Sequence, residues 1–384
     1  MREPSRRWPV GLGRTTAAAV LVAAAALLTA FLVEAAPGSP AASSCRWRRA
    51  APSRLSSAVD VTSVAAQSAS NVWLVGFAYR SSADDAPGTW HWNGRRWLGA
   101  GVKGLTARVA PLISVASSGR DAWAVGRKGS NGALTLRWNA RFRDRFGYTW
   151  WAQVPVPRAL GRAGLNSVAM VSRRDVWAVG DGIVLRWRGT WSRVPTPPFV
   201  AGWSGLYVTR IVGTNGVWIT GYDQDSDQWH AARWTGSGWA DSTVAPGLIH
   251  ARPGLNIAAV STSNAWIVGR SLDRKGRALV FHWDGSSWSA VAGLPLPTGV
   301  ASELSGVTAR TASDVWAVGS YRLSTGATRS LMLHWNGTHW SRLTAPGTGL
   351  SEVAIVPGSR QAWAVGGSYL GKRLILNNVI RYRC

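Results

Sequence analysis

The chain has 384 residues, which is enough for one to three domains with a large buried core. A hydrophobic content of 46% with 16% charged residues is typical of a globular protein and excludes a disordered one. The 43 Lys and Arg against 18 Asp and Glu give a formal charge of +25. This charge favours polyanionic partners, unless it only reflects an Arg-rich composition.

The N-terminus is typical of an export signal. Four arginines within the first 14 residues precede an apolar run over residues 15–33, and Val33-Glu34-Ala35 offers a cleavage site with small residues. We therefore predict a signal peptide over residues 1–35, a linker over 36–44 and a mature chain that is secreted or held at the cell surface. The apolar run is long for a signal peptide, so an uncleaved membrane anchor is the alternative.

An internal repeat dominates the rest of the chain. The sequence VWAVG, or a close variant, recurs seven times at spacings of 41 to 54 residues. This period is typical of a four-stranded propeller blade. The tryptophans of the seven motifs are Trp73, Trp123, Trp177, Trp218, Trp266, Trp316 and Trp363.

Each repeat divides into four predicted strands. An apolar first strand leads through a turn ending in Asp or Asn to the VWAVG strand, and a third strand ending in His-Trp or Arg-Trp precedes a fourth that begins with Trp. Between the last two strands stand Asn93-Gly94, Asn336-Gly337 and Asp284-Gly285, which predict a tight hairpin with positive φ at both turn residues. The pattern predicts an all-β, seven-bladed β-propeller over residues 45–384, with the tryptophans packed between blades.

The motifs DVWAVG and HWNGxxW resemble the repeats of secreted bacterial β-propellers, especially of actinobacterial type. They are similar, more loosely, to tectonin-like and kelch-like propellers. The resemblance spans all seven repeats and implies the fold. It does not imply one ligand, because such families include lectins, assembly factors and a few enzymes.

The two ends of the chain together form one blade. The seventh repeat ends at Cys384 without a fourth strand, whereas Cys45-Arg46-Trp47 matches the start of a fourth strand. We therefore expect the N-terminal strand to complete the last blade. We also expect Cys45 and Cys384 to form a disulfide where the other blades have a hairpin turn.

The loops between strands two and three, and between blades, are expected on one face, where propellers usually bind ligands. Basic residues are frequent in these loops, and they predict an anionic ligand or surface unless they are merely solvated. Arg270, Arg277 and Arg322 are the basic candidates.

Aromatic residues in the same loops are candidates for stacking on a sugar ring, with packing within the loops as the alternative. The main candidates are Trp203, Tyr222, Trp229 and Tyr321, and Tyr79 and Tyr369 occupy related positions after the repeat glycine.

Signals for a metal or for catalysis are weak. Asp223, Asp225 and Asp227 alternate as at the start of a calcium loop, but the glycine and the final glutamate of such a loop are missing. We expect no cofactor, with calcium as a minor alternative. His91, His282 and His334 share one repeat position and are expected to be structural, whereas His250 in a long loop is the candidate for an enzyme.

We therefore predict an exported, monomeric, non-catalytic binding or scaffold propeller. Its expected partner is an envelope glycan, an anionic polymer or another envelope protein, and not a nucleic acid. One alternative is a lyase or hydrolase acting at the channel mouth. Another is a protein-interaction scaffold that uses the extended ribbon at residues 141–148 of the second blade.

Overall fold

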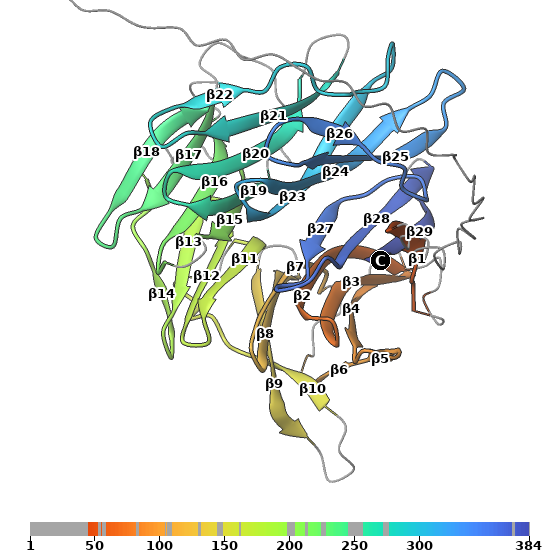
Figure 1. Cartoon of the computed structure of the whole chain (residues 1–384). Helices are drawn as coiled ribbons and strands as arrows, with labels where there is room; N and C mark the ends of the chain where they lie inside the picture. The colour runs from red at the N-terminus through yellow and green to blue at the C-terminus, as the bar shows by residue number, and fades with distance from the viewer. Residues whose placement is uncertain are drawn as a thin grey trace, which may run out of the picture. The chain divides into compact units, whose positions relative to one another are not determined.

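The computed structural model shows an all-β chain in which seven blades form a β-propeller (Figure 1). It describes residues 45–383 except for segments 53–54, 56–58, 82–83, 104, 106–109, 130–131, 144–148, 161–162, 198–203, 212–213, 224–227, 245–255, 272–275 and 371–372. The predicted signal peptide and linker lie outside the described residues. No helix in the described part is long and apolar enough to cross a membrane.

The strands follow the predicted order, from the innermost to the outermost of each blade. Blade 1 comprises β2 (Val59–Ser68), β3 (Asn71–Ser81), β4 (Asp84–Trp92) and β5 (Trp97–Gly99), and blade 2 comprises β7 (Leu112–Ser118), β8 (Asp121–Lys128), β9 (Gly132–Arg143) and β10 (Thr149–Gln153). Blade 3 comprises β11 (Leu165–Ser172), β12 (Asp175–Gly180), β13 (Ile183–Trp187) and β14 (Trp191–Arg193), and blade 4 comprises β15 (Ser204–Arg210), β16 (Val217–Asp223), β17 (Gln228–Trp234) and β18 (Trp239–Val244). Blades 5 to 7 comprise β19 (Ile257–Ser261), β20 (Asn264–Arg270), β21 (Ala278–Trp283), β22 (Trp288–Ala290); β23 (Ser302–Thr311), β24 (Asp314–Arg322), β25 (Thr328–Trp335), β26 (Trp340–Arg342); and β27 (Glu352–Ile355), β28 (Ala362–Leu370), β29 (Arg373–Arg383), β1 (Arg46–Arg49).

One strand was not predicted. β6 (Gly101–Lys103) pairs in parallel with β10, so the second blade has five strands. It belongs to the connection from blade 1 to blade 2, and a run of three residues is too short to produce a recognisable hydrophobic pattern.

The VWAVG strands are apolar throughout because neighbouring blades cover both of their faces. Every residue of β12 is buried, for example. The glycine that ends the motif allows the innermost strand to approach closely. A Cβ added at Gly76 would lie 1.8 Å from the carbonyl oxygen of Asp60, and Gly180 and Gly319 meet the inner strands of their own blades in the same way.

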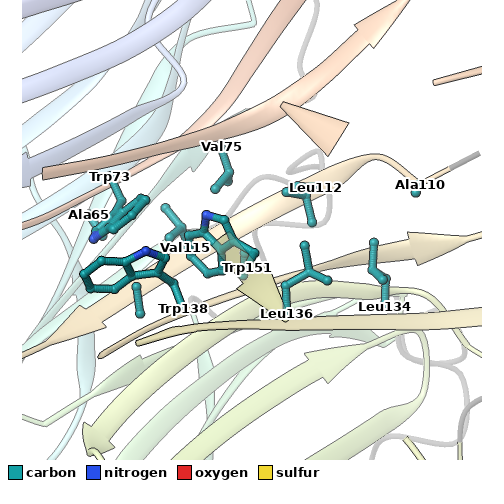
Figure 2. Packing of buried hydrophobic residues seen from close by; sticks show 12 residues of the cluster. Ala65, Trp73, Val75, Ala110, Leu112, Val115, Leu134, Leu136, Trp138 and Trp151 are labelled. Carbon is teal, nitrogen blue, oxygen red and sulfur yellow. The ribbon is translucent and has the colours of Figure 1, made fainter. Parts of the chain in front are cut away.

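The tryptophans pack between blades, as predicted (Figure 2). Trp73 of blade 1 lies with its ring centroid 4.6 Å from that of Trp138 and 5.1 Å from that of Trp151, both on blade 2. Each VWAVG tryptophan thus contacts aromatic residues on strands three and four of the following blade, where rings of this size bury a large apolar area. The equivalent groups centre on Trp123, Trp177, Trp218, Trp266, Trp316 and Trp363.

The Asn-Gly loops join strands three and four, as predicted. Trp92 pairs directly with Trp97, so the loop consists of the four residues between these two tryptophans. The Oδ1 atom of Asn93 accepts hydrogen bonds from the amides of Arg95 and Arg96, and Gly94 has a φ of 96°. The asparagine therefore caps the loop through its side chain, and the predicted positive φ is present at Gly94.

The ring closes between the two ends of the chain, as predicted. β1 pairs with β29 in antiparallel register, with Trp47 opposite Tyr382 and Arg46 opposite Arg383. Arg46 and Arg383 are the sequence neighbours of the two cysteines. Cys384 lies outside the described residues, so the disulfide stays a prediction.

Candidate functional site

A central cavity of about 760 Å³ runs between the innermost strands of all seven blades. Its lining includes residues of β2, β7, β11, β15, β19, β23 and β27. The loops predicted to carry the ligand site stand at the end of the cavity where these inner strands begin. We call this end the loop-rich mouth.

One repeat position recurs on the inner strands around the cavity, and five of its seven occupants line it. It lies opposite the second valine of the VWAVG motif, or the residue in its place, and just after a β-bulge in most of the inner strands. We call it the inner-ring position. Its occupants from blade 1 to blade 7 are Ser63, Ser114, Ser167, Tyr207, Asn256, Gly306 and Glu352.

The inner-ring serines join one blade to the next. The hydroxyl of Ser63 accepts a hydrogen bond from the amide of Val115 at 3.0 Å, and that of Ser114 accepts one from Val168 at 3.3 Å. Ser167 bonds in the same way to Val208. Short hydroxyl side chains therefore satisfy backbone amides at the first three junctions.

Glu352 occupies this position at the junction that closes the ring. Its carboxylate accepts a hydrogen bond from the amide of Val64 at 3.1 Å, and the Ser63 hydroxyl also bonds to it. Burial raises the pKa of Glu352 from 4.5 to about 7, although both hydrogen bonds oppose the shift. The closing junction therefore carries an acidic group that titrates near neutral pH.

Asp60 is a second buried carboxylate of the cavity wall. It is 7% exposed and lines the cavity, and its carboxylate has no hydrogen-bond or ion-pair partner among the residues that the structure describes. Burial alone raises its pKa from 3.8 to about 6. Asp60 stands opposite Phe77, and Glu303 has the same place in blade 6, opposite Ser320.

The three carboxylates lie on three adjacent blades, since blade 7 stands between blades 6 and 1. We call Asp60, Glu303 and Glu352 the acidic wall; all three line the cavity. Glu303 accepts a hydrogen bond from Ser320 and lies 3.7 Å from Arg270.

Tyr207 faces the acidic wall from blade 4, on the opposite side of the ring. Burial raises the pKa of its phenol, and the charge of Glu352 raises it further. Arg210 lines the cavity at the far end of the same strand, away from the loop-rich mouth. The described lining thus holds three carboxylates against one arginine, although the whole chain is strongly basic.

The predicted basic residues occupy different environments. Arg270 pairs with Glu303, whereas Arg277 and Arg322 are exposed. The structure thus leaves these two arginines on the surface and places acidic side chains inside the cavity. Sequence reasoning missed these acidic side chains.

The aromatic candidates that the structure describes are not exposed platforms. Trp229 lies in β17 and not in a loop, is 4% exposed and belongs to a hydrophobic cluster between blades 4 and 5. Tyr321 is partly buried against another cluster. Tyr79, Tyr222 and Tyr369 lie on strands, but their side chains are outside the described part, as is Trp203.

The calcium candidates do not form a described site. Asp223 is the last residue of β16, is buried, and stands opposite Gln228 of β17. Asp225 and Asp227 lie outside the described residues. No group of three metal-ligating side chains occurs among the residues that the structure describes.

The histidines of the repeat are structural, as predicted. His91 stacks on Trp73 with ring centroids 4.2 Å apart and bonds through Nε2 to Asn71 at 3.0 Å. His334 packs against Trp316 and bonds to Asp314, and His282 follows the same pattern. No described histidine lines the cavity, and His250 lies outside the described residues.

One signal in the sequence marks the inner-ring position. The inner strands contain Ser-Val-Ala in blades 1, 2 and 3, and Glu352-Val353-Ala354 stands at the same place in blade 7. An alignment of the repeats shows this replacement of serine by glutamate. It does not show that the side chain faces the cavity, because the bulge shifts the alternation of the strand.

The fold is shared with solved propellers. The chain is similar to the RRP9 WD40 repeats with a TM-score of 0.58 and 13% identity, over 88% of this chain and 96% of that one. It is similar to YCF48 bound to D1 peptide with a TM-score of 0.57 and 12% identity, over the same shares of the two chains. No protein-family model and no curated protein matches the sequence. At these identities the likeness shows the fold alone, a seven-bladed β-propeller with WD40-like structural neighbours.

Proposed function

We propose that the protein is a non-catalytic binding propeller outside the cytoplasm, which holds a segment of a partner protein at the loop-rich mouth of its central cavity. The observation that carries this proposal is the cavity itself. All seven blades contribute to its wall, and the wall presents polar side chains from several of them. A site of this kind suits recognition of an inserted segment, whereas the described histidines serve packing and turns.

Two further observations support the choice of partner and place. One of the similar solved propellers is titled as bound to a peptide, which is consistent with a peptide or protein ligand for this fold. The basic N-terminus, the apolar run and the repeats that resemble secreted bacterial propellers support export. The buried position of Trp229 gives no support to a glycan that stacks on it.

Site-specific photo-crosslinking tests the proposal in the full chain. A photoreactive amino acid replaces Ser305, which lines the cavity, and in a matched variant it replaces Ser192, which is exposed on the outermost strand of blade 3. We expect the Ser305 variant to yield a discrete crosslinked protein that the Ser192 variant does not yield. Ser305→Trp, which fills the cavity, should prevent the association of that protein. The same adducts from both positions would contradict a partner at the cavity.

A further inference from the structure

The acidic wall contains a buried charge that nothing in the described structure balances. Asp60 is 7% exposed, and within the described part of the chain its carboxylate has neither a hydrogen-bond nor an ion-pair partner, yet it borders an open cavity. Buried carboxylates are normally paired, because removing a charge from water is costly. Asp60 is therefore a side chain that lacks its counterpart.

Two further carboxylates line the same cavity. Glu352 on blade 7 and Glu303 on blade 6 border the cavity beside Asp60, and Arg270 offsets only Glu303, at 3.7 Å. Arg210 stands on the opposite blade and toward the other end. Asp60 and Glu303 precede the inner-ring position of their strands and so lie nearer the loop-rich mouth, whereas Glu352 occupies the inner-ring position itself. A positive group that enters from this mouth would therefore meet Asp60 and Glu303 before Glu352.

The chemistry of the wall distinguishes between kinds of cation. A bare metal ion needs several ligands converging at short range, and no such group of three occurs in the described part of the chain. An ammonium or guanidinium group needs only hydrogen-bond acceptors and negative charge around it. Carboxylates spread over three blades meet this need.

We propose that the central cavity binds a lysine or arginine side chain of the partner segment, with Asp60 and Glu352 as its counter-charges and the Tyr207 phenol as a hydrogen-bonding wall opposite them. This inference rests on the proposed function, since it names the chemistry of the inserted segment. The net charge of the protein makes the proposal specific to the cavity. A protein with a charge of +25 repels free cationic peptides, so binding of such a peptide has to come from a local acidic site.

Fluorescence anisotropy with defined peptides tests the proposal on the full chain. The probe is a labelled, end-capped Gly-Ser-Lys-Ser-Gly peptide, and the comparison probe carries acetyl-lysine at the centre. We expect the lysine probe to bind about tenfold more tightly or better at pH 8, because a charge-assisted hydrogen bond in a sheltered site has an energy of that order. Its affinity should fall between pH 8 and pH 5, as Glu352 and Asp60 take up protons with pKa values of about 7 and about 6.

Variants localise the effect. Asp60→Asn and Glu352→Gln keep the shapes of the side chains, and each should weaken the lysine probe about tenfold. Asp284→Asn is the matched control. It removes one carboxylate from the β21–β22 turn, where Asn93 and Asn336 hold the same position in other blades, so it should change nothing.

Equal affinity for the lysine and acetyl-lysine probes, including no binding of either, would overturn the inference. So would unchanged binding in both Asp60→Asn and Glu352→Gln. Thermal unfolding of each variant verifies that it folds. If a partner still crosslinks at Ser305 while the lysine probe fails, the chemical class of the inserted group is wrong and the binding function stands.

Discussion

The carboxylate of Glu352 and the backbone amide of Val64 form a 3.1 Å hydrogen bond between residues 288 positions apart in the chain. This bond spans the junction at which the last blade meets the first. At three other junctions a serine of the inner ring makes the equivalent bond. Ring closure is therefore coupled to an ionisable group, whereas these three junctions use neutral ones.

Glu352→Gln should change how stability depends on pH. The folded pKa of about 7 lies above the ordinary value of 4.5, so the folded state holds a proton that the unfolded state has released. The contribution of Glu352 to the free energy of unfolding is therefore fully present below about pH 4.5 and is lost as the pH rises to 7. Glutamine remains neutral and still accepts from Val64, so the variant should be more stable than the parent at pH 8, by on the order of 1–3 kcal/mol. The two should differ little at pH 5.

Urea unfolding at pH 5 and pH 8 measures this difference. Glu352→Ala is the companion variant, since it leaves the Val64 amide and the Ser63 hydroxyl without their acceptor and should destabilise at both pH values. The raised pKa of Asp60 causes a smaller loss of stability as the pH rises to about 6. The Glu352→Gln variant still shows this smaller loss. Parallel pH profiles for the parent and Glu352→Gln would show that this carboxyl does not titrate in that range.

Oxidation of Cys45 and Cys384 should join the ends of the ring. The pairing of β1 with β29 sets Arg46 opposite Arg383, which are the sequence neighbours of the two cysteines, and a covalent link across a loop of this length restricts the unfolded chain. We expect non-reducing peptide mapping of the protein to find one disulfide-linked pair of peptides that contains both cysteines. Reduction, or Cys45→Ser, should lower stability by about 2–4 kcal/mol. Alkylation of both thiols in the unreduced, unfolded protein would rule the bond out.

Trp363→Ala should weaken the interface between the last blade and the first. Trp363 is fully buried, with its ring centroid 5.5 Å from that of Trp92 and 5.1 Å from that of Trp97. Loss of a buried tryptophan leaves a large cavity, so we expect a loss of about 3–5 kcal/mol in urea unfolding. Leu98→Ala, at a position 38% exposed beside the same cluster, is the control and should cost less than about 0.5 kcal/mol. Similar losses for the two variants would mean that Trp363 does not hold the junction.

The sequence by itself determined the architecture. Seven VWAVG motifs at blade-like spacing predicted seven blades, and Trp47 at the start of a fourth-strand pattern predicted the blade shared by both ends. These features are local or repeated: each strand shows its own pattern, and each tryptophan fills the same kind of gap between blades. Because these patterns repeat, they can be recognised in the sequence without any knowledge of long-range contacts.

Only the tertiary structure decided what the cavity presents. Asp60, Glu303 and Glu352 stand far apart in the chain, and only closure of the ring brings their blades together. The bulge before the inner-ring position shifts the alternation of the inner strands, so the pattern of apolar and polar residues does not assign faces there. Trp229 was misplaced for a related reason, because its polar neighbours resemble a loop although it lies in the buried β17. The basic residues of the loops predicted an anionic ligand, which stays a prediction, whereas the field inside the cavity depends on the few charges that line it.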